Sequence, residues 1–160
     1  MVKDYKNDRL FPLVKRMIMH HKNLFDSNVL NATLKQDQQE GFDLVLSFAS
    51  GNIAVRLRKN KYFFTYRDFT VRYQSNNPNA KTEIHKIIEG CADYYFYGWE
   101  SQDGTRVEYY MILGLDMFRI ALIDDPPREP IKNYDGTSFL HYDLPWLVRN
   151  DVILYKNFLI

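Results

Sequence analysis

Two stretches with alternating side chains decide the predicted fold: Ile53-Ala54-Val55-Arg56-Leu57-Arg58 and Asp68-Phe69-Thr70-Val71-Arg72-Tyr73-Gln74. Because successive side chains of a strand point to opposite faces, this alternation predicts two β-strands that are each apolar on one face. The same alternation places Arg56, Arg58 and Arg72 on the other face. If the two strands pair, the three arginines form a cationic stripe across the sheet.

Further helices and strands are predicted on both sides of these stretches. Apolar residues from Leu10 to Phe25 recur at i, i+3, i+4 and i+7, which predicts an amphipathic N-terminal helix. A first strand is predicted at residues 42–48, and a second helix follows Thr82 and ends at Gly90. Residues 94–99 and 107–115 are apolar on both faces, as central strands are. The predicted fold is α/β (α+β), with a mixed sheet, a helix first and a second helix after three strands.

The chain is long enough for one domain. A domain of 160 residues buries roughly 70% of the surface that its unfolded chain exposes, so we expect a single globular unit. Its core is predicted at about residues 8–123, followed by an irregular covering tail at 124–160. Within this tail, residues 138–142 and 152–155 are weaker strand candidates that would cover an edge.

Composition limits the environment and the chemistry. The single cysteine, Cys91, excludes an internal disulfide framework and is expected to be a small packed side chain, which suits a reducing compartment. No segment has the pattern of a signal peptide or of a membrane span. The expected location is therefore the cytoplasm, including the cytoplasm of a host. Neither a phosphate-binding glycine loop nor a Gly-x-Ser-x-Gly nucleophile motif is found.

The distribution of charge along the chain matters more than its total for binding an anion. The formal net charge is only +1, which argues against binding a polyanion through bulk charge. A local patch can still bind phosphates, and Arg56, Arg58 and Arg72 are the candidates for recognising them. The alternative is a solvated sheet face on which acids neutralise the arginines. The candidate acids are Asp43, Asp68 and Glu83.

The start of the second helix has two interpretations. Thr82 can cap the helix, with Glu83 interacting with the helix dipole and Lys86 lying on an adjacent face one turn later. Alternatively, Glu83 lies beside the arginine face as a metal ligand or clamp, which requires its side chain to point at the sheet. The aromatic run at residues 94–99 has two interpretations as well, base stacking or core packing, and apolar residues on both strand faces favour the core.

Three motifs carry a resemblance to a known group of proteins. They are Asp68-Phe69-Thr70-Val71-Arg72, Lys81-Thr82-Glu83-Ile84-His85-Lys86-Ile87-Ile88-Glu89-Gly90 and Asp93-Tyr94-Tyr95-Phe96-Tyr97-Gly98. With residues 53–58, they resemble an uncharacterised family of phage and mobile-element proteins that are sometimes described as nuclease-like. The resemblance covers about residues 41–119. Together with the helix-first order, it implies the restriction-endonuclease-like core, also written PD-(D/E)XK.

A nuclease of that type needs two acids for a metal ion and a lysine near the scissile phosphate. Asp43 can supply the first acid, but Ala54-Val55-Arg56 or Thr70-Val71-Arg72 stands where acid-x-Lys is expected. Asp68 and Glu83 are the candidate replacements. The predicted catalytic residues are Asp43, Asp68, Glu83 and Lys86. The metal ion, Mg²⁺ or Mn²⁺, would be bound by Asp43, Asp68 and Glu83. The phosphates would be bound by Arg56, Arg58 and Arg72.

The sequence therefore predicts a nucleic-acid-engaging, nuclease-like protein of phage or mobile-element type. It would bind DNA or RNA phosphates through the arginine face, with metal-dependent phosphodiester cleavage as an open extension. The alternative from another class is a non-enzymatic interaction or inhibitor protein that binds a host protein partner. A third interpretation, a small-molecule phosphate binder, predicts a pocket that is too narrow for a duplex.

Overall fold

The computed structural model of the protein describes residues 9–21, 29–31, 44–46, 51–126 and 129–159. They form an α+β protein built on a mixed β-sheet, which confirms the predicted fold class. No helix in these ranges is both long and apolar enough to cross a membrane. The helices are α1 (Phe11–His20), α3 (Asn60–Thr65), α4 (Glu83–Ile88), α5 (Leu115–Asp124) and α6 (Leu144–Arg149).

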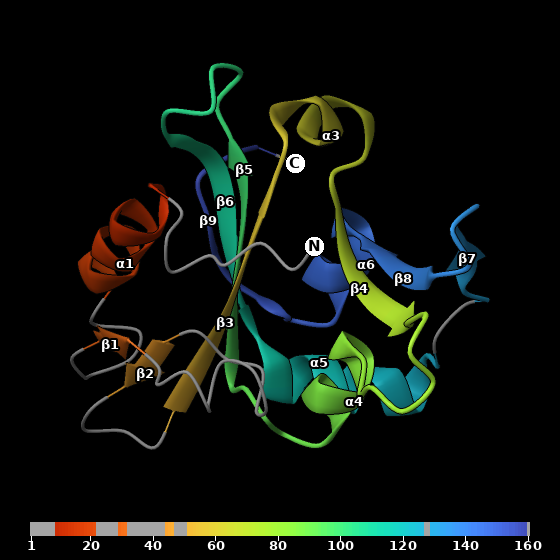
Figure 1. Ribbon diagram of the computed structural model, residues 1–160. Helices are drawn as coiled ribbons and strands as arrows, with labels where there is room; N and C mark the ends of the chain where they lie inside the picture. The colour runs from red at the N-terminus through yellow and green to blue at the C-terminus, as the bar shows by residue number, and fades with distance from the viewer. Residues whose placement is uncertain (1–8, 22–28, 32–43, 47–50, 127–128, 160) are drawn as a thin grey trace.

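The larger sheet, sheet A, has six strands (Figure 1). In spatial order they are β1 (Val29–Asn31), β2 (Leu44–Leu46), β3 (Gly51–Arg58), β5 (Tyr94–Glu100), β6 (Val107–Gly114) and β9 (Ile153–Lys156). Neighbours are antiparallel except β3 and β5, which are parallel. Parallel neighbours need a crossover connection, and the connection between β3 and β5 contains α3, β4 and α4.

The two arginine-bearing segments do not pair. β4 (Asp68–Gln74) belongs to a second sheet, sheet B, in which it pairs with β8 (Ser138–Asp143), which in turn pairs with β7 (Ile131–Lys132). Both sides of β3 are already taken, by β2 on one side and β5 on the other. Arg56 and Arg58 therefore lie in a different sheet from Arg72, and no continuous stripe forms across one sheet.

The C-terminal tail is more regular than the sequence analysis expected. Residues 124–160 supply β7, β8, α6 and β9 instead of an irregular covering segment. The two weaker strand candidates, 138–142 and 152–155, correspond to β8 and β9. β9 lies at an edge of sheet A, beside β6, while β8 is the central strand of sheet B. The tail therefore helps to build both sheets.

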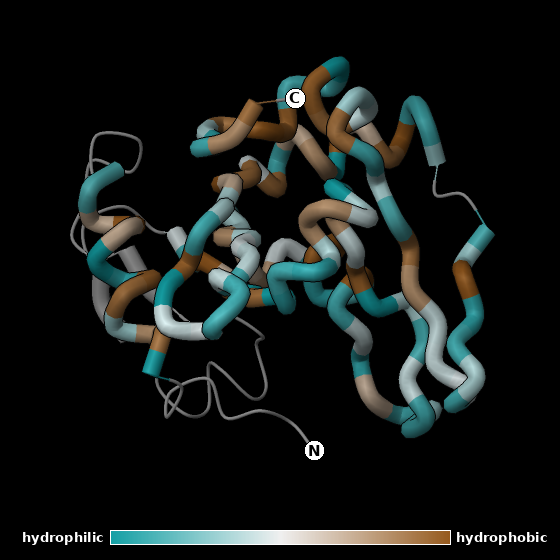
Figure 2. The backbone as a smooth tube through the Cα atoms, turned by 90° about the horizontal axis from the view of Figure 1, so that it is seen from above, coloured by the Kyte–Doolittle hydropathy of each residue, from teal (hydrophilic) through white to brown (hydrophobic). Residues whose placement is uncertain are grey.

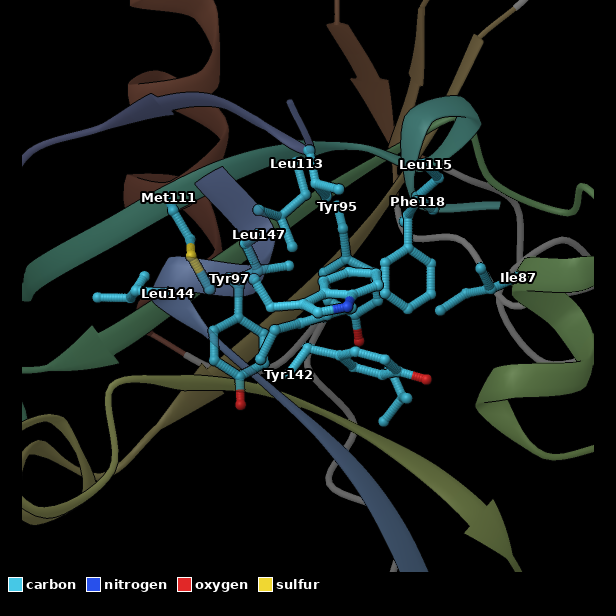
Figure 3. Packing of buried hydrophobic residues seen from close by; sticks show 14 of the residues in the cluster. Ile87, Tyr95, Tyr97, Met111, Leu113, Leu115, Phe118, Tyr142, Leu144 and Leu147 are labelled. Atoms are coloured by element: carbon cyan, nitrogen blue, oxygen red, sulfur yellow. The ribbon is translucent and has the colours of Figure 1, made fainter. Parts of the chain in front are cut away.

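Side chains on the two faces of sheet A enter two different clusters. On one face, Ile53 and Val55 of β3 pack with Val14 and Ile18 of α1. The other face carries Tyr95, Tyr97 and Trp99 of β5 and is covered by sheet B together with α4, α5 and α6. Figure 3 shows this second cluster, in which Tyr97, Phe118 and Leu147 are fully buried or nearly so. The aromatic run 94–99 is therefore core, as its apolar pattern favoured.

Candidate nucleic-acid interface

Arg56 and Arg58 lie between the two sheets. Both share the face of β3 that carries Ala54, which belongs to the cluster under sheet B. They are part of a group of polar side chains at this junction, which we call the inter-sheet polar layer. Its members are Arg56, Arg58, Asp68, Thr70, Glu83, Tyr95, Tyr97 and His141.

Among the described residues, Arg56 contacts Thr70 and Glu83. Its Nη1 donates a hydrogen bond to the carbonyl oxygen of Thr70 at 2.7 Å, and its Nη2 lies 3.0 Å from Oε2 of Glu83. Glu83 also accepts hydrogen bonds from the backbone N–H of Arg72, at 2.9 Å, and from the hydroxyl of Tyr95. Glu83 therefore points at the sheet, as the site interpretation required. The other interpretation made Thr82 a cap, but its side chain makes no capping hydrogen bond.

Arg58 occupies the other end of the layer. Its Nη1 lies 3.2 Å from Oδ1 of Asp68 and 3.2 Å from the hydroxyl of Tyr97. The guanidinium carbon lies 4.6 Å from the centroid of the Tyr62 ring, which is a cation–π distance. Asp68 is also 3.8 Å from Nδ1 of His141. Most of the Arg58 and Asp68 side-chain surface is buried by these contacts.

The layer also satisfies the unpaired edge of β4. Among the described strands, β4 is the outer strand of sheet B on this side, so its outward backbone groups have no strand partner in this part of the chain. The N–H of Thr70 lies 3.4 Å from the Tyr97 hydroxyl, its carbonyl accepts from Arg56, and the N–H of Arg72 donates to Glu83. The layer therefore joins sheet B to sheet A, and this structural role accounts for Arg56, Arg58 and Glu83.

Burial changes the acidity of two members of the layer. Desolvation raises the pKa of Asp68 above its ordinary value of 3.8, although Arg58 and His141 act in the opposite direction. Desolvation also raises the pKa of Tyr95 well above its ordinary value, and the nearby Glu83 carboxylate adds to this effect. The Tyr95 hydroxyl therefore remains a hydrogen-bond donor to Glu83 at neutral pH.

The raised pKa of Asp68 predicts a pH dependence of stability. A carboxyl group whose pKa is higher in the folded state binds more protons there, so its stabilising effect is present below pH 3.8 and lost as pH rises through the raised pKa. We expect the unfolding free energy of the wild type, relative to Asp68→Asn, to fall as pH rises from about 3.5 to 6. Urea unfolding of both proteins across this range measures the difference. If the unfolding free energy of the wild type relative to Asp68→Asn rises with pH instead, the attraction of Arg58 lowers the pKa of Asp68 by more than desolvation raises it.

The remaining predicted site residues, Arg72, Lys86 and Asp43, are not members of the layer. The Arg72 side chain is exposed on sheet B, and only its backbone N–H bonds to Glu83. Lys86 is half-buried in α4. Asp43 is outside the described residues, so its distance to Glu83 and Asp68 is not defined. Within the described part of the chain, no group of three or more His, Cys, Asp or Glu side chains is arranged to hold a metal ion.

A second basic surface lies on α3, a helix that was not predicted from the sequence. Residues 44–67 contain five basic residues and no Asp or Glu, although the whole chain is nearly neutral. This acid-free run is the signal that could have located the surface. We call the exposed part of it the α3 ridge. Its members are Lys59, Lys61, Phe64, Tyr66 and Arg67.

The α3 ridge exposes two aromatic rings beside its cations. Phe64 is 65% exposed and Tyr66 is 58% exposed, which is unusual for large aromatic side chains. Phe63, their neighbour, is buried and stacks on Tyr109 with ring centroids 3.7 Å apart. Because Phe63 anchors the helix to the core, the outward position of Phe64 is a fixed feature of α3.

The cations of the α3 ridge differ in their partners. Lys59 pairs with the buried Glu100 at 3.0 Å, but its own side chain remains mostly exposed. Lys61 lies over the ring of Tyr62, and Arg67 lies over the ring of Phe63 and donates to the carbonyl oxygen of Leu159. Among the described residues, neither Lys61 nor Arg67 has an acidic side chain within ion-pair distance. These two charges are available to an anion.

An open groove runs between α3 and the turn that joins β5 to β6, at residues 101–106. Both lie at the same end of the molecule, which Figure 2 views from above. The groove consists of two adjoining hollows of about 620 Å³ and about 460 Å³. Asn60, Ser101, Gln102 and Asp103 line both of them. Lys59, Lys61 and Arg9 line the first hollow, and Phe64 and Arg106 line the second.

Comparison with known proteins gives no relative from which to infer a function. The sequence matches no protein family, no curated protein is similar to it, and no solved structure matches the fold. The functional argument therefore depends on the geometry of the inter-sheet polar layer and the α3 ridge.

Proposed function

We propose that this protein binds nucleic acid, and that the α3 ridge makes the phosphate contacts. The observation that carries the proposal is the pair of cations Lys61 and Arg67, which have no acidic partner among the described residues and lie beside exposed aromatic rings. Basic side chains supply most of the affinity for a polyanion, and aromatic rings add contacts to bases. A cytoplasmic location, in the producing cell or in a host, is part of this proposal.

The proposal moves the phosphate contacts away from Arg56 and Arg58. Each of these arginines has a carboxylate within 3.2 Å or less and further hydrogen bonds inside the inter-sheet polar layer. A phosphate would have to compete with these carboxylates for the guanidinium groups. Arg72 keeps an exposed side chain and remains a candidate for an additional phosphate contact.

The salt dependence of binding tests the proposal. Contacts from Lys59, Lys61 and Arg67 to three phosphates predict that log K falls with log salt with a slope of about −2 for a single strand. Fluorescence anisotropy with labelled DNA and RNA oligonucleotides, from about 50 to 300 mM NaCl, measures this slope. Undetectable binding at the lowest salt, or an affinity independent of salt, would refute the proposal.

Metal-dependent cleavage remains a separate proposal, supported by the helix-first order and by the resemblance to nuclease-like proteins. Its acids would be Asp43, Asp68 and Glu83, with Mg²⁺ or Mn²⁺ as the metal and Lys86 nearby. Two of these acids already bind guanidinium groups, which would repel a cation placed between them. The described residues therefore favour binding over cleavage. Incubation of labelled oligonucleotides with Mg²⁺ or Mn²⁺ tests cleavage, with Asp43→Asn as the inactive control.

A protein-binding function is the second candidate. It is favoured by apolar side chains exposed on neighbouring helices α4 and α5, since such patches occur at protein interfaces. The exposed side chains are Ile88, Met117, Ile120 and Ile123. In this case the protein would act as a non-enzymatic interaction or inhibitor protein on a host protein partner. A wild-type protein that binds neither single-stranded nor duplex nucleic acid at low salt would favour this candidate over the first.

A further inference from the structure

We infer that the nucleic acid bound at the α3 ridge is single-stranded, and that an unpaired base stacks on Phe64. This inference rests on the proposed nucleic-acid binding and adds the class of ligand. It follows from three features of the same surface: the fixed exposed ring, the mixed charge of the groove beside it and the position of the unpaired cations, with Lys61 lining the groove and Arg67 following α3.

The Phe64 ring is positioned for stacking before any ligand binds. It contacts the ring of Phe63 edge-on at 5.4 Å and the ring of Tyr109 edge-on at 6.1 Å. Phe63 in turn contacts Trp99 and Phe158 in the core. These contacts hold the ring perpendicular to its two aromatic neighbours and leave 65% of the residue exposed. A ring held in this way loses little conformational entropy when a base stacks on it.

The groove beside Phe64 has mixed charge, because the cations Arg9, Lys59, Lys61 and Arg106 line it together with three acids. Its acids are Glu100, Glu108 and Asp103, and hydrogen bonds from the Ser101 and Thr105 hydroxyls lower the pKa of Asp103 to about 2. A carboxylate that is ionised at neutral pH repels phosphate but accepts hydrogen bonds from the amino groups of bases. The exposed Gln102 amide can both donate to and accept from a base edge.

Phosphates then follow Lys61, which lines the first hollow of the groove, and Arg67, which comes after the end of α3. Lys61 and Phe64 are three residues apart in α3 and therefore lie on the same side of the helix. A backbone that passes Lys61 and Arg67 keeps its phosphates near these cations while its bases turn toward Phe64 and the groove. Bases paired in a duplex cannot do this, because their faces are stacked and their pairing edges are occupied. The surface therefore selects unpaired nucleotides.

Binding of matched single-stranded and duplex oligonucleotides of about 12 nucleotides tests the inference. We expect the single strand to bind at least about tenfold more tightly than the duplex at the same salt concentration. Phe64→Ala should weaken single-strand binding about tenfold and leave duplex binding and the salt slope unchanged. Phe64→Leu should lose as much as Phe64→Ala, whereas Phe64→Trp should bind as the wild type does, because stacking needs a flat aromatic ring.

A single strand that carries abasic sites is the matched ligand control, because it keeps the phosphates and lacks bases. It should bind the wild type and Phe64→Ala equally. If duplex and single strand bind the wild type equally, or if Phe64→Ala binds single strands as the wild type does, the inference is wrong and the proposed function stands. If the wild type binds none of these ligands, both the proposed function and the inference are wrong.

Discussion

The double substitution Lys61→Glu/Arg67→Glu is expected to weaken nucleic-acid binding about 100-fold at low salt. Each substitution removes one charge-assisted phosphate contact and places a carboxylate near the same phosphate. A loss of about 1.4 kcal/mol at each position, which is tenfold, gives the combined effect if the two positions are independent. Anisotropy titrations at about 50 mM NaCl measure the loss, and the log–log salt slope should fall by about 1.4 for a single strand.

The matched control for this prediction is Lys15→Glu/Arg16→Glu on α1. It changes the net charge by the same amount, but α1 packs against the face of sheet A that is opposite to sheet B. We expect this variant to bind within about threefold of the wild type, because only long-range attraction changes. Equal losses in the two double variants would mean that overall charge, and not the α3 ridge, determines the affinity.

Regular periodicity predicted the elements of the fold well. The helix from Leu10, the helix after Thr82 and the strands at 53–58 and 68–74 all occur, because each has a consistent apolar period. The strands at 94–99 and 107–115 occur as well, since runs that are apolar on both faces are typical of central strands. The pairing partner of β4 could not be read from the sequence. Phe69 and Val71 would be buried equally well beside β3 or beside β8, and β8 lies about 70 residues further along the chain. Alternation specifies a buried face but not the strand that pairs.

The same limit applies to the predicted arginine face. Alternation placed Arg56 and Arg58 on one face of β3, which is correct, but it could not show that sheet B covers that face. The partner of Arg56 comes from α4, and the partner of Arg58 comes from the start of β4. Helix α3 was missed because six residues are too few to establish a helical period. Its acid-free composition was visible in the sequence, and it is the feature on which the proposed function now depends.

Among the predicted changes in stability, Glu83→Ala is expected to have the largest effect, a loss of about 3 kcal/mol in unfolding free energy. Glu83 accepts from three donors: the Arg56 guanidinium, the Arg72 backbone N–H and the Tyr95 hydroxyl. Removing the carboxylate takes the Glu83 anion away from a guanidinium that is only one-quarter exposed, and it takes the acceptor away from the hydroxyl of the buried Tyr95. Breaking such a pair costs more than the pair contributes, because the remaining groups stay desolvated.

Glu89→Ala, in the residue that follows α4, is the control for Glu83→Ala. Glu89 pairs with Lys81 at 2.7 Å, but both side chains are largely exposed, so its removal should cost less than about 1 kcal/mol. Urea unfolding of the two variants measures the contrast. Arg56→Met/Glu83→Leu should recover only the part of the loss that comes from the guanidinium, because the Arg72 N–H and the Tyr95 hydroxyl still lose their acceptor. A loss below about 1 kcal/mol for Glu83→Ala would contradict the structural role of the layer and restore the arginines as candidates for phosphate binding.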